Sequence, residues 1–348
     1  MNIENIIKNI PKVELHCHID GSIRPKTILE LLLSDGIDVP FFNIEQAKNY
    51  FQVNGDCSSL KDYLDKFHFP IRVMQKKSNI YRIVMELIED SKMDGIIYTE
   101  LRLAPLQHMK CGLSAEEVIE TVLEAMKDGK EKYGVISVLI LCSLRHEPVL
   151  KSIEVVNLAK KYNSKGVVAV DLAGNENDFP PELHKKAFDL AYEYGINITI
   201  HAGETGICSN ILKSIIDLHA TRIGHGIYAY LDKKTLQYLI DNHITLEMCP
   251  TSNLQTKAIS DFSEHPIRTY LKQGINVTLN TDNRTVSNIT LTDEYMNLIS
   301  KLGFDLEEIL QLIKNGINSS FTSKEMKDTM LEKFYTFVKK LSQSEKVK

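Results

Sequence analysis

Residues 195–203, GINITIHAG, contain the pattern that decides the fold of this chain: a glycine that ends a helical segment, then a short apolar run with polar residues at its end. The same order recurs elsewhere, with the glycine at Gly95, Gly134, Gly166 and Gly274. A glycine at this position adopts the left-handed conformation that ends a helix and lets the chain enter a strand. Strands and helices are therefore predicted to alternate along the chain.

Eight strand-like runs follow from this pattern and its variants. Two of them, within residues 220–226 and 241–250, follow a helix without the glycine, and the first, KVELHCH, spans residues 12–18. Eight strands that alternate with helices favour a parallel sheet closed into a (β/α)8 TIM barrel. The alternative, an open doubly wound sheet, usually has a G-x-G-x-x-G phosphate-binding sequence after its first strand, and residues 16–25 contain none.

The length fits one such barrel with additions. A plain barrel needs about 250 residues, and this chain has 348. Much of the surplus lies between the first two strands, in residues 20–95, which are predicted to form a helical insertion. Residues 306–348 are predicted to form extra C-terminal helices. No linker or change of composition divides the chain, so we expect a single domain over residues 1–348.

Composition excludes several classes of protein. Lysine and arginine number 41, aspartate and glutamate 46, and the net charge of −5 offers no basic surface to nucleic acid or an anionic membrane. The longest apolar run, residues 135–142, is far shorter than the roughly 20 residues of a membrane helix. The N-terminus lacks an apolar signal core, and the six cysteines include no C-x-x-C pair. We therefore expect a cytoplasmic protein without nucleic-acid or membrane partners; its oligomeric state stays open.

Polar residues stand at the C-terminal ends of several predicted strands. The first strand ends in His16-Cys17-His18, and because positions two apart share a face, both imidazoles point inward while Cys17 points toward the helices. The fifth strand ends at His201, and Asp282 follows the eighth. In a barrel, the C-terminal ends of all strands meet at one mouth. These histidines and the aspartate are therefore predicted to converge.

This convergence predicts a metal site. Buried imidazoles and a carboxylate without partners are costly, and a divalent ion removes that cost. Three nitrogens and one carboxylate oxygen suit zinc, and Fe(II), Co(II) or Mn(II) accept the same donors. The mouth end of the fourth strand, residues 167–174, has no lysine or glutamate to bridge two ions. We predict one metal ion per chain with the ligands His16, His18, His201 and Asp282.

Two further residues are predicted to act on a metal-activated water molecule. Glu204 lies three residues beyond His201, past a small Ala-Gly step, where a carboxyl group can serve as general acid or base. His225 lies between two glycines at the end of the sixth strand and has space to approach the same water. The structural alternatives are a carboxylate at a helix N-terminus for Glu204 and a packing imidazole for His225.

Other polar residues are expected to have supporting roles. Glu100 and Arg102, near the end of the second strand, are predicted to form an internal ion pair that supports the site; the alternative is a contact with a ligand. Residues 249–253, CPTSN, follow the seventh strand at the mouth, but the sequence assigns them no contact. Seven histidines are expected on the surface or in packing: His68, His108, His146, His184, His219, His243 and His265.

The motifs PKVELHCHIDGSIRP, DLAGNE, HAGE, GHG and NTD occur in this order, and from about Pro11 to the C-terminal helices the chain resembles the adenosine deaminase family of metal-dependent barrel hydrolases. The resemblance implies one zinc ion and hydrolytic deamination of adenosine and 2′-deoxyadenosine, a reaction of purine salvage. It assigns the four ligands named above to zinc. It also implies that a zinc-activated hydroxide, assisted by His225, attacks C6 of the purine while Glu204 protonates N1.

The same resemblance implies substrate contacts. The backbone N–H of Gly174 would bind the purine, and His18 and Asp20 would contact the nucleoside, with Asp20 at the ribose. Asn283 stands where many relatives have aspartate, and its amide can donate to purine N7 at any pH. Residues 59–67, SLKDYLDKF, are similar to the family's apolar gate over the substrate. The gate residues would be Leu60, Tyr63, Leu64 and Phe67.

The nearest alternative is a deaminase of free adenine or of modified adenosines with the same fold. Asp20 favours a nucleoside, because related base deaminases tend to have the longer glutamate there. An AMP deaminase would need cationic groups for the phosphate, and Arg24 leaves that reading open. Cytidine-type zinc deaminases carry H-x-E and P-C-x-x-C, which this chain lacks. A non-catalytic binding protein would have no use for Glu204 and His225 beside four ligands.

Overall fold

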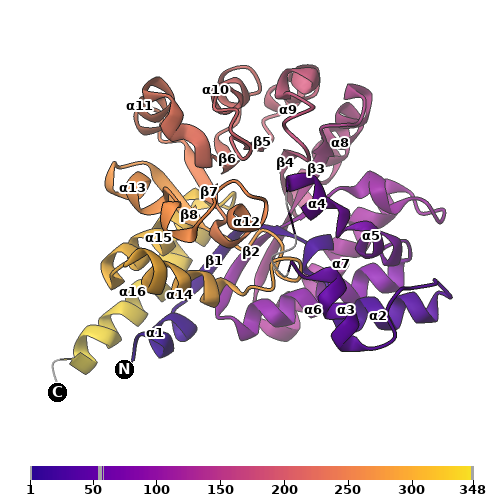
Figure 1. Cartoon of the computed structure of the whole chain (residues 1–348), viewed down its shortest axis with the longest axis horizontal. Coiled ribbons are helices and arrows are strands. Elements are labelled where there is room, and N and C mark those ends of the chain that lie inside the picture. The colour runs from indigo at the N-terminus through magenta and orange to yellow at the C-terminus, as the bar shows by residue number, and fades with distance from the viewer. Residues whose placement is uncertain (1, 54–56, 58, 346–348) are drawn as a thin grey trace.

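The computed structural model describes residues 2–53, 57 and 59–345. Within these residues, eight parallel strands pair in chain order and form a barrel with helices around it (Figure 1). The strands are β1 (Lys12–His18), β2 (Ile96–Leu103), β3 (Ile136–Leu144), β4 (Val167–Ala173), β5 (Asn197–Ala202), β6 (Arg222–His225), β7 (Thr245–Met248) and β8 (Asn276–Leu279). The predicted (β/α)8 barrel is confirmed.

The barrel closes between β1 and the segment that follows β8. The backbone N–H of Asp282 donates to the carbonyl of His16 (2.9 Å), and the N–H of His18 donates to the carbonyl of Asp282 (2.8 Å). Two residues before Asp282, the side-chain oxygen of Asn280 accepts from the N–H of Leu15 (3.0 Å). The seam therefore brings His16, His18 and Asp282 side by side through their own backbones.

The helices of the barrel layer pack on the outer face of these strands. They are α6 (Lys77–Met93), α7 (Ala115–Tyr133), α8 (Val149–Tyr162), α9 (Lys185–Glu193), α10 (Ser209–Ile216), α11 (Lys233–Asp241) and α13 (Ile267–Lys272). The helix α1 (Ile3–Asn9) precedes β1, and α12 (Pro250–Gln255) follows β7 at the mouth of the barrel. Successive side chains of β5 point alternately to the helices and to the barrel interior. Ile198 and Ile200 lie in the apolar core, whereas Thr199 donates to the interior carboxylate of Glu247 (2.9 Å).

The glycine signals in the sequence formed as predicted. The five glycines that precede strands have positive φ angles, from 66° to 118°. A capping box starts α7, with the Ser114 side chain accepting from the backbone N–H of Glu117. None of the helices in the described part of the chain is both long and apolar enough to cross a membrane.

The predicted helical insertion lies between β1 and α6. It contains α2 (Pro25–Ser34), α3 (Ile44–Phe51), α4 (Leu60–Asp65) and α5 (His68–Val73). Its attachment to the rest of the chain includes a backbone hydrogen bond from Val53 N–H to the Val286 carbonyl (2.8 Å). After β8 come α14 (Leu291–Leu302), α15 (Leu306–Ser319) and α16 (Lys324–Glu345), and the last two are the extra C-terminal helices predicted from residue 306 onward. Of these, α15 packs beside β1 and β8.

Candidate active site

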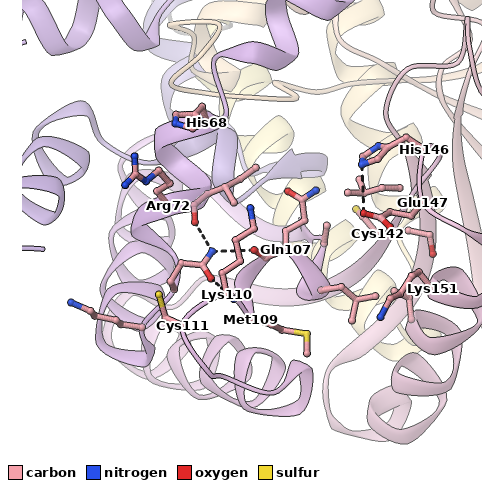
Figure 2. A pocket seen from close by; sticks show the side chains of 18 of the residues that line it. His68, Arg72, Gln107, Met109, Lys110, Cys111, Cys142, His146, Glu147 and Lys151 are labelled. Carbon is pink, nitrogen blue, oxygen red and sulfur yellow. Dashed lines mark hydrogen bonds and ion pairs between the residues drawn. The ribbon is translucent and has the colours of Figure 1, made fainter. Parts of the chain in front are cut away.

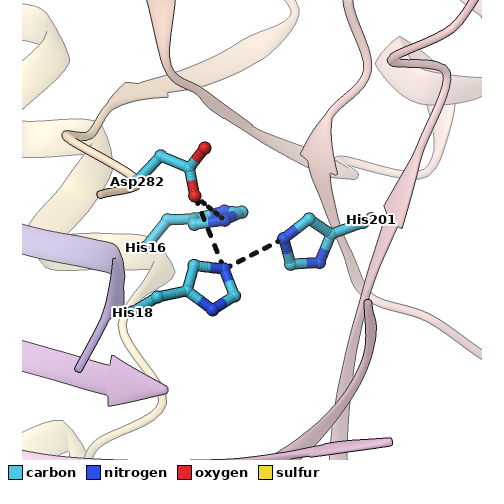
Figure 3. Close-up of side chains that lie close together, drawn as sticks. All are labelled: His16, His18, His201 and Asp282. Atoms are coloured by element: carbon cyan, nitrogen blue, oxygen red, sulfur yellow. Dashed lines mark hydrogen bonds and ion pairs between the residues drawn. The ribbon is translucent and has the colours of Figure 1, made fainter. Parts of the chain in front are cut away.

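The four residues predicted as metal ligands point toward one another at the barrel mouth (Figure 3). Their candidate ligand atoms all lie within 4.8 Å of one another. His18 Nε2 is 3.2 Å from His201 Nε2 and 3.5 Å from Asp282 Oδ1, and His16 Nε2 is 3.4 Å from the same oxygen. The structure thus brings together the whole predicted set.

The donor atoms of this cluster fit a divalent metal ion. His16 Nε2 is buried and has no hydrogen-bond partner among the described residues. The opposite ring nitrogen, Nδ1, contacts a carboxylate in two of the histidines. His16 Nδ1 lies 3.0 Å from Glu247, and His201 Nδ1 lies 3.1 Å from Asp171. A carboxylate at Nδ1 keeps the proton there, so the lone pair of Nε2 faces the cluster. Burial also lowers the pKa of His16 and His18, which keeps both rings neutral.

Two buried arginines hold the supporting carboxylates inside the barrel. Arg102 donates to Asp171 (2.9 Å) and to Glu247, and Arg222 donates to Glu247 (2.6 Å) and Glu100 (2.6 Å). The predicted pair between Glu100 and Arg102 is therefore wrong, because closer partners reach each of them from strands across the barrel. Sequence reasoning missed Asp171 and Glu247. Their inward positions in β4 and β7 are the signal that could have marked them.

The loop that carries Glu204 is held by the carboxylate of Glu176. Glu176 accepts from the backbone N–H groups of Gly203 (3.0 Å), Glu204 (2.6 Å) and Thr205 (2.7 Å). The Glu204 side chain is itself buried, and burial raises its pKa. A raised pKa increases the protonated fraction near neutral pH, as a proton donor requires. Glu176, the last residue of the DLAGNE motif, was not predicted to have a role.

His225 faces Glu204 across the cavity. Its Nε2 lies 3.8 Å from Glu204 Oε2. Its backbone has a φ of 65°, a conformation that residues with side chains rarely adopt. Such strain is common at functional sites, where the surrounding structure holds it in place.

Residues of α12 contact the cluster from the side of β7. Ser252 Oγ donates to Asp282 Oδ2 (2.6 Å), and Asn253 Nδ2 lies 3.1 Å from His225 Nδ1. The other end of the Asn253 amide, Oδ1, lies 3.1 Å from Nε2 of the buried His265. The CPTSN segment therefore makes two contacts that the sequence did not assign, and His265, expected only in packing, connects to the site through Asn253.

The remaining six histidines lie outside the cluster. His68, His146 and His243 are exposed, His219 is half-buried, and His108 and His184 are buried in packing. Of these, His146 also lines the active-site cavity.

The cluster opens into a cavity of about 360 Å³, within the usual range for small-molecule sites. The predicted catalytic and substrate-contacting residues line it together: His18, Asp20, Gly174, Glu204, His225 and Asn283. The predicted gate residues line it from the insertion: Leu60, Tyr63, Leu64 and Phe67. Burial raises the pKa of Asp20 to about 6. Asn283 Oδ1 packs so closely on Gly21 that a Cβ there would lie 1.8 Å from it.

A larger cavity of about 970 Å³ adjoins this one (Figure 2). Arg72, Lys110 and Lys151 are among its lining residues. Six residues line both cavities: Ile71, Ala104, Gln107, Cys142, Leu144 and His146. None of the four clustered ligand residues lines the larger cavity, so the smaller one is the candidate active site.

The whole chain resembles known proteins in sequence and in fold. A family model described as adenosine deaminase matches residues 11–337. An adenosine deaminase from Clostridium acetobutylicum is 60% identical, over 96% of this chain and 99% of its own. Among solved structures, adenine deaminase from Arthrobacter aurescens has a TM-score of 0.89 at 28% identity and covers 95% of this chain and 99% of its own. The N6-methyl-AMP deaminase from Arabidopsis thaliana has a TM-score of 0.85 at 27% identity, over 96% and 98%.

Proposed function

This chain belongs to the adenosine deaminase family, and from that membership we propose that it hydrolyses adenosine and 2′-deoxyadenosine to inosine and deoxyinosine, with release of ammonia. The observation that carries this proposal is the meeting of His16, His18, His201 and Asp282 in the cavity that Glu204 and His225 also line. The 60% identity to an adenosine deaminase over nearly the full chain supports adenosine as the substrate.

We propose that these four side chains hold one zinc ion. Three imidazole nitrogens and a carboxylate oxygen are donors that zinc accepts, and Glu247 and Asp171 orient two of the rings for it. When bound, such an ion lowers the pKa of a coordinated water molecule to about 7 and so supplies a nucleophile near neutral pH.

Glu204 is proposed as the proton donor to the purine. C6 of adenine is a poor electrophile while the ring stays aromatic, and protonation of N1 opens it to attack. Because burial raises the pKa of Glu204, its carboxyl group can carry the proton that N1 receives. The three backbone hydrogen bonds to Glu176 keep this carboxyl group at the cavity wall.

Two residues are proposed to align the attacking oxygen. One oxygen of Asp282 is fixed by Ser252, which leaves the other directed toward the histidines. His225 faces the same space, with Nε2 toward Glu204. An oxygen held between these groups would attack C6, while Glu204 would supply the proton to N1.

The remaining cavity residues are proposed to bind the nucleoside. The N–H of Gly174 would meet the purine, His18 would contact the nucleoside, Asp20 would meet the ribose, and the amide of Asn283 would meet the purine N7. All four line the cavity. Asn283 can serve as a donor there without taking up a proton, which an aspartate would need.

We propose a role in purine salvage in the cytoplasm. The reaction converts adenosine into inosine, a purine nucleoside that salvage can reuse. The described residues form no disulfide, which is typical of proteins in a reducing compartment.

Formation of the 6-oxopurine product from a panel of substrates, separated by chromatography, tests the proposal; this product is common to all of them, whereas N6-methyladenosine would release methylamine in place of ammonia. We expect turnover of adenosine and 2′-deoxyadenosine to exceed that of adenine, AMP and N6-methyladenosine by at least about 100-fold in kcat/KM. Glu204→Gln protein, purified in parallel, shows whether any activity comes from a contaminant. If adenine outpaces adenosine, the free-base alternative replaces the proposed function; if N6-methyladenosine or AMP does so, a modified-nucleoside or nucleotide deaminase replaces it.

A further inference from the structure

We propose that Asn253 and His265 are positioning residues that hold the proton of His225 on Nε2, the ring nitrogen that faces the cavity. Three successive hydrogen bonds carry this inference. They run from Ile267 N–H to His265 Nδ1 (3.3 Å), then between His265 Nε2 and Asn253 Oδ1 (3.1 Å), and then between Asn253 Nδ2 and His225 Nδ1 (3.1 Å). The inference deepens the proposed function and rests on it, because it states how His225 meets the attacking oxygen.

The direction of these hydrogen bonds is set at their outer end. Ile267 is the first residue of α13, so its N–H has no carbonyl partner within the helix. A backbone N–H can only donate, and therefore His265 Nδ1 accepts and carries no proton. His265 is buried, and burial lowers its pKa to about 3, which keeps the ring neutral. The single proton of this ring is on Nε2, from which it is donated to Asn253 Oδ1.

The orientation of the Asn253 amide determines which hydrogen bond His225 receives. Its side chain is fully buried, and its oxygen accepts from His265. The amide nitrogen, which can only donate, then faces His225 Nδ1. His225 Nδ1 must accept, so a neutral His225 has its proton on Nε2. This orientation of the Asn253 amide follows from the Ile267 N–H.

The backbone conformation holds the His225 ring beside the Asn253 amide. His225 and Gly226 both have left-handed φ angles, 65° and 64°, and α12 holds Asn253 through its backbone N–H to the Cys249 carbonyl (2.9 Å). The ring is therefore fixed between a donor at Nδ1 and the cavity at Nε2.

The consequence concerns the role that His225 can take. With a proton on Nε2, the ring offers the cavity a hydrogen-bond donor and no lone pair. It can therefore hold and stabilise the attacking oxygen, but it cannot accept that oxygen's proton. A reversed tautomer would present a lone pair to the cavity and lose this stabilisation.

Nitrogen NMR of the zinc-loaded full chain, labelled with ¹⁵N-histidine and free of substrate, reads the tautomer directly. His225→Gln assigns the His225 signals by their loss. We expect the native protein to show a protonated Nε2 and a bare Nδ1. In Asn253→Asp, which has nearly the same shape but presents a carboxylate, we expect the proton on Nδ1. This variant should lose about 100-fold in kcat, as expected for a misoriented catalytic group, with KM changed less than about threefold and zinc content unchanged.

A second pair of variants tests His265, at the outer end of this series of hydrogen bonds. His265→Gln retains an N–H donor for Asn253 and should keep most of the native kcat, whereas His265→Leu removes the donor and should lose at least about tenfold. His108→Gln alters another buried imidazole, which belongs neither to this series of hydrogen bonds nor to the lining of either cavity. This variant controls for general loss of packing.

The inference is overturned if native His225 carries its proton on Nδ1, if Asn253→Asp keeps the native tautomer, or if Asn253→Asp and His265→Leu both retain native kcat. Because the tautomer is read without substrate, a native chain that shows the expected tautomer but does not deaminate adenosine overturns the proposed function and leaves the hydrogen-bond assignment supported.

Discussion

The hydroxyl group of Tyr63 lies 2.8 Å from that of Ser287, and this hydrogen bond fastens α4 of the insertion to the segment that follows β8. Tyr63 is buried against Val53 and Val286 and also lines the active-site cavity. A polar contact therefore supplements the apolar packing of the predicted gate.

Removal of this hydroxyl group should weaken the attachment of α4 over the cavity, and, if α4 acts as the predicted gate, should ease its opening. Tyr63→Phe keeps the ring and loses a hydrogen bond worth about 1 kcal/mol, so we expect inosine to dissociate about fivefold faster in stopped-flow measurements. Ser287→Ala should have the same effect, and the double variant should add nothing further. Unchanged dissociation in both single variants would show that the hydrogen bond does not govern opening.

Substitution of Glu204 should separate chemistry from metal binding. Glu204→Gln keeps the shape of the side chain but supplies no acid, so we expect kcat to fall about 100- to 10,000-fold. Zinc content, measured by atomic emission, should stay equal to that of the native protein because Glu204 is not among the clustered ligands. A variant with near-normal kcat would remove Glu204 from the proposed mechanism.

Loss of the Glu247 carboxylate should affect both stability and metal affinity. Glu247 accepts from His16, Arg102 and Arg222 in the barrel interior. Glu247→Gln leaves two buried guanidinium groups undercompensated, and we expect the free energy of unfolding to fall by about 3–5 kcal/mol. Zinc affinity, measured by chelator competition, should drop about 10- to 100-fold.

An exposed ion pair offers the matched control. Asp189→Asn weakens the contacts of Asp189 with Lys185 on α9 and with His219 and should cost less than about 1 kcal/mol in the same urea titration. If Glu247→Gln were no worse than this control, the interior carboxylate would not support the site.

Glu294 should make the protein less stable as the pH rises. Its carboxyl group is buried; Oε1 accepts from Thr251 N–H (3.0 Å), and burial raises its pKa to about 8. In the unfolded chain it ionises near its ordinary pKa of about 4.3. Between these values the unfolded state releases a proton that the folded state keeps, so the contribution of Glu294 is complete below about pH 4 and declines up to about pH 8.

The variant Glu294→Gln should remove this dependence. We expect its urea midpoint to exceed the native one increasingly from pH 5 to pH 8, with little difference at pH 4.5. Parallel curves for the two proteins across that range would contradict the raised pKa of Glu294.

The sequence predicted those parts of the site that depend on order along the chain. Alternation within β1 placed His16 and His18 on one face, and the rule that parallel strand ends meet at one mouth brought His201 and Asp282 to them. The bounds predicted for β1, residues 12–18, are those observed. The glycines that precede strands marked the helix ends, because the conformation of a glycine there depends only on neighbouring residues.

Contacts that cross the barrel could not be predicted in this way. Glu100 and Arg102 stand two positions apart, yet each pairs with a residue from a distant strand because the geometry of the closed barrel selects the partner. The connection of His265 to His225 depends on the orientation of one amide on α12. Such choices follow from three-dimensional packing and leave no periodic signal in the sequence.

The seam of the barrel also sets when the proposed zinc site can exist during synthesis. Two donors, on His16 and His18, leave the ribosome early, but the carboxylate of Asp282 is made only after β8, and its backbone completes the ring with β1. A nascent chain that lacks this last segment has an incomplete coordination sphere and an unpaired first strand. Completion of the proposed metal site and closure of the barrel therefore depend on the same late segment of the chain.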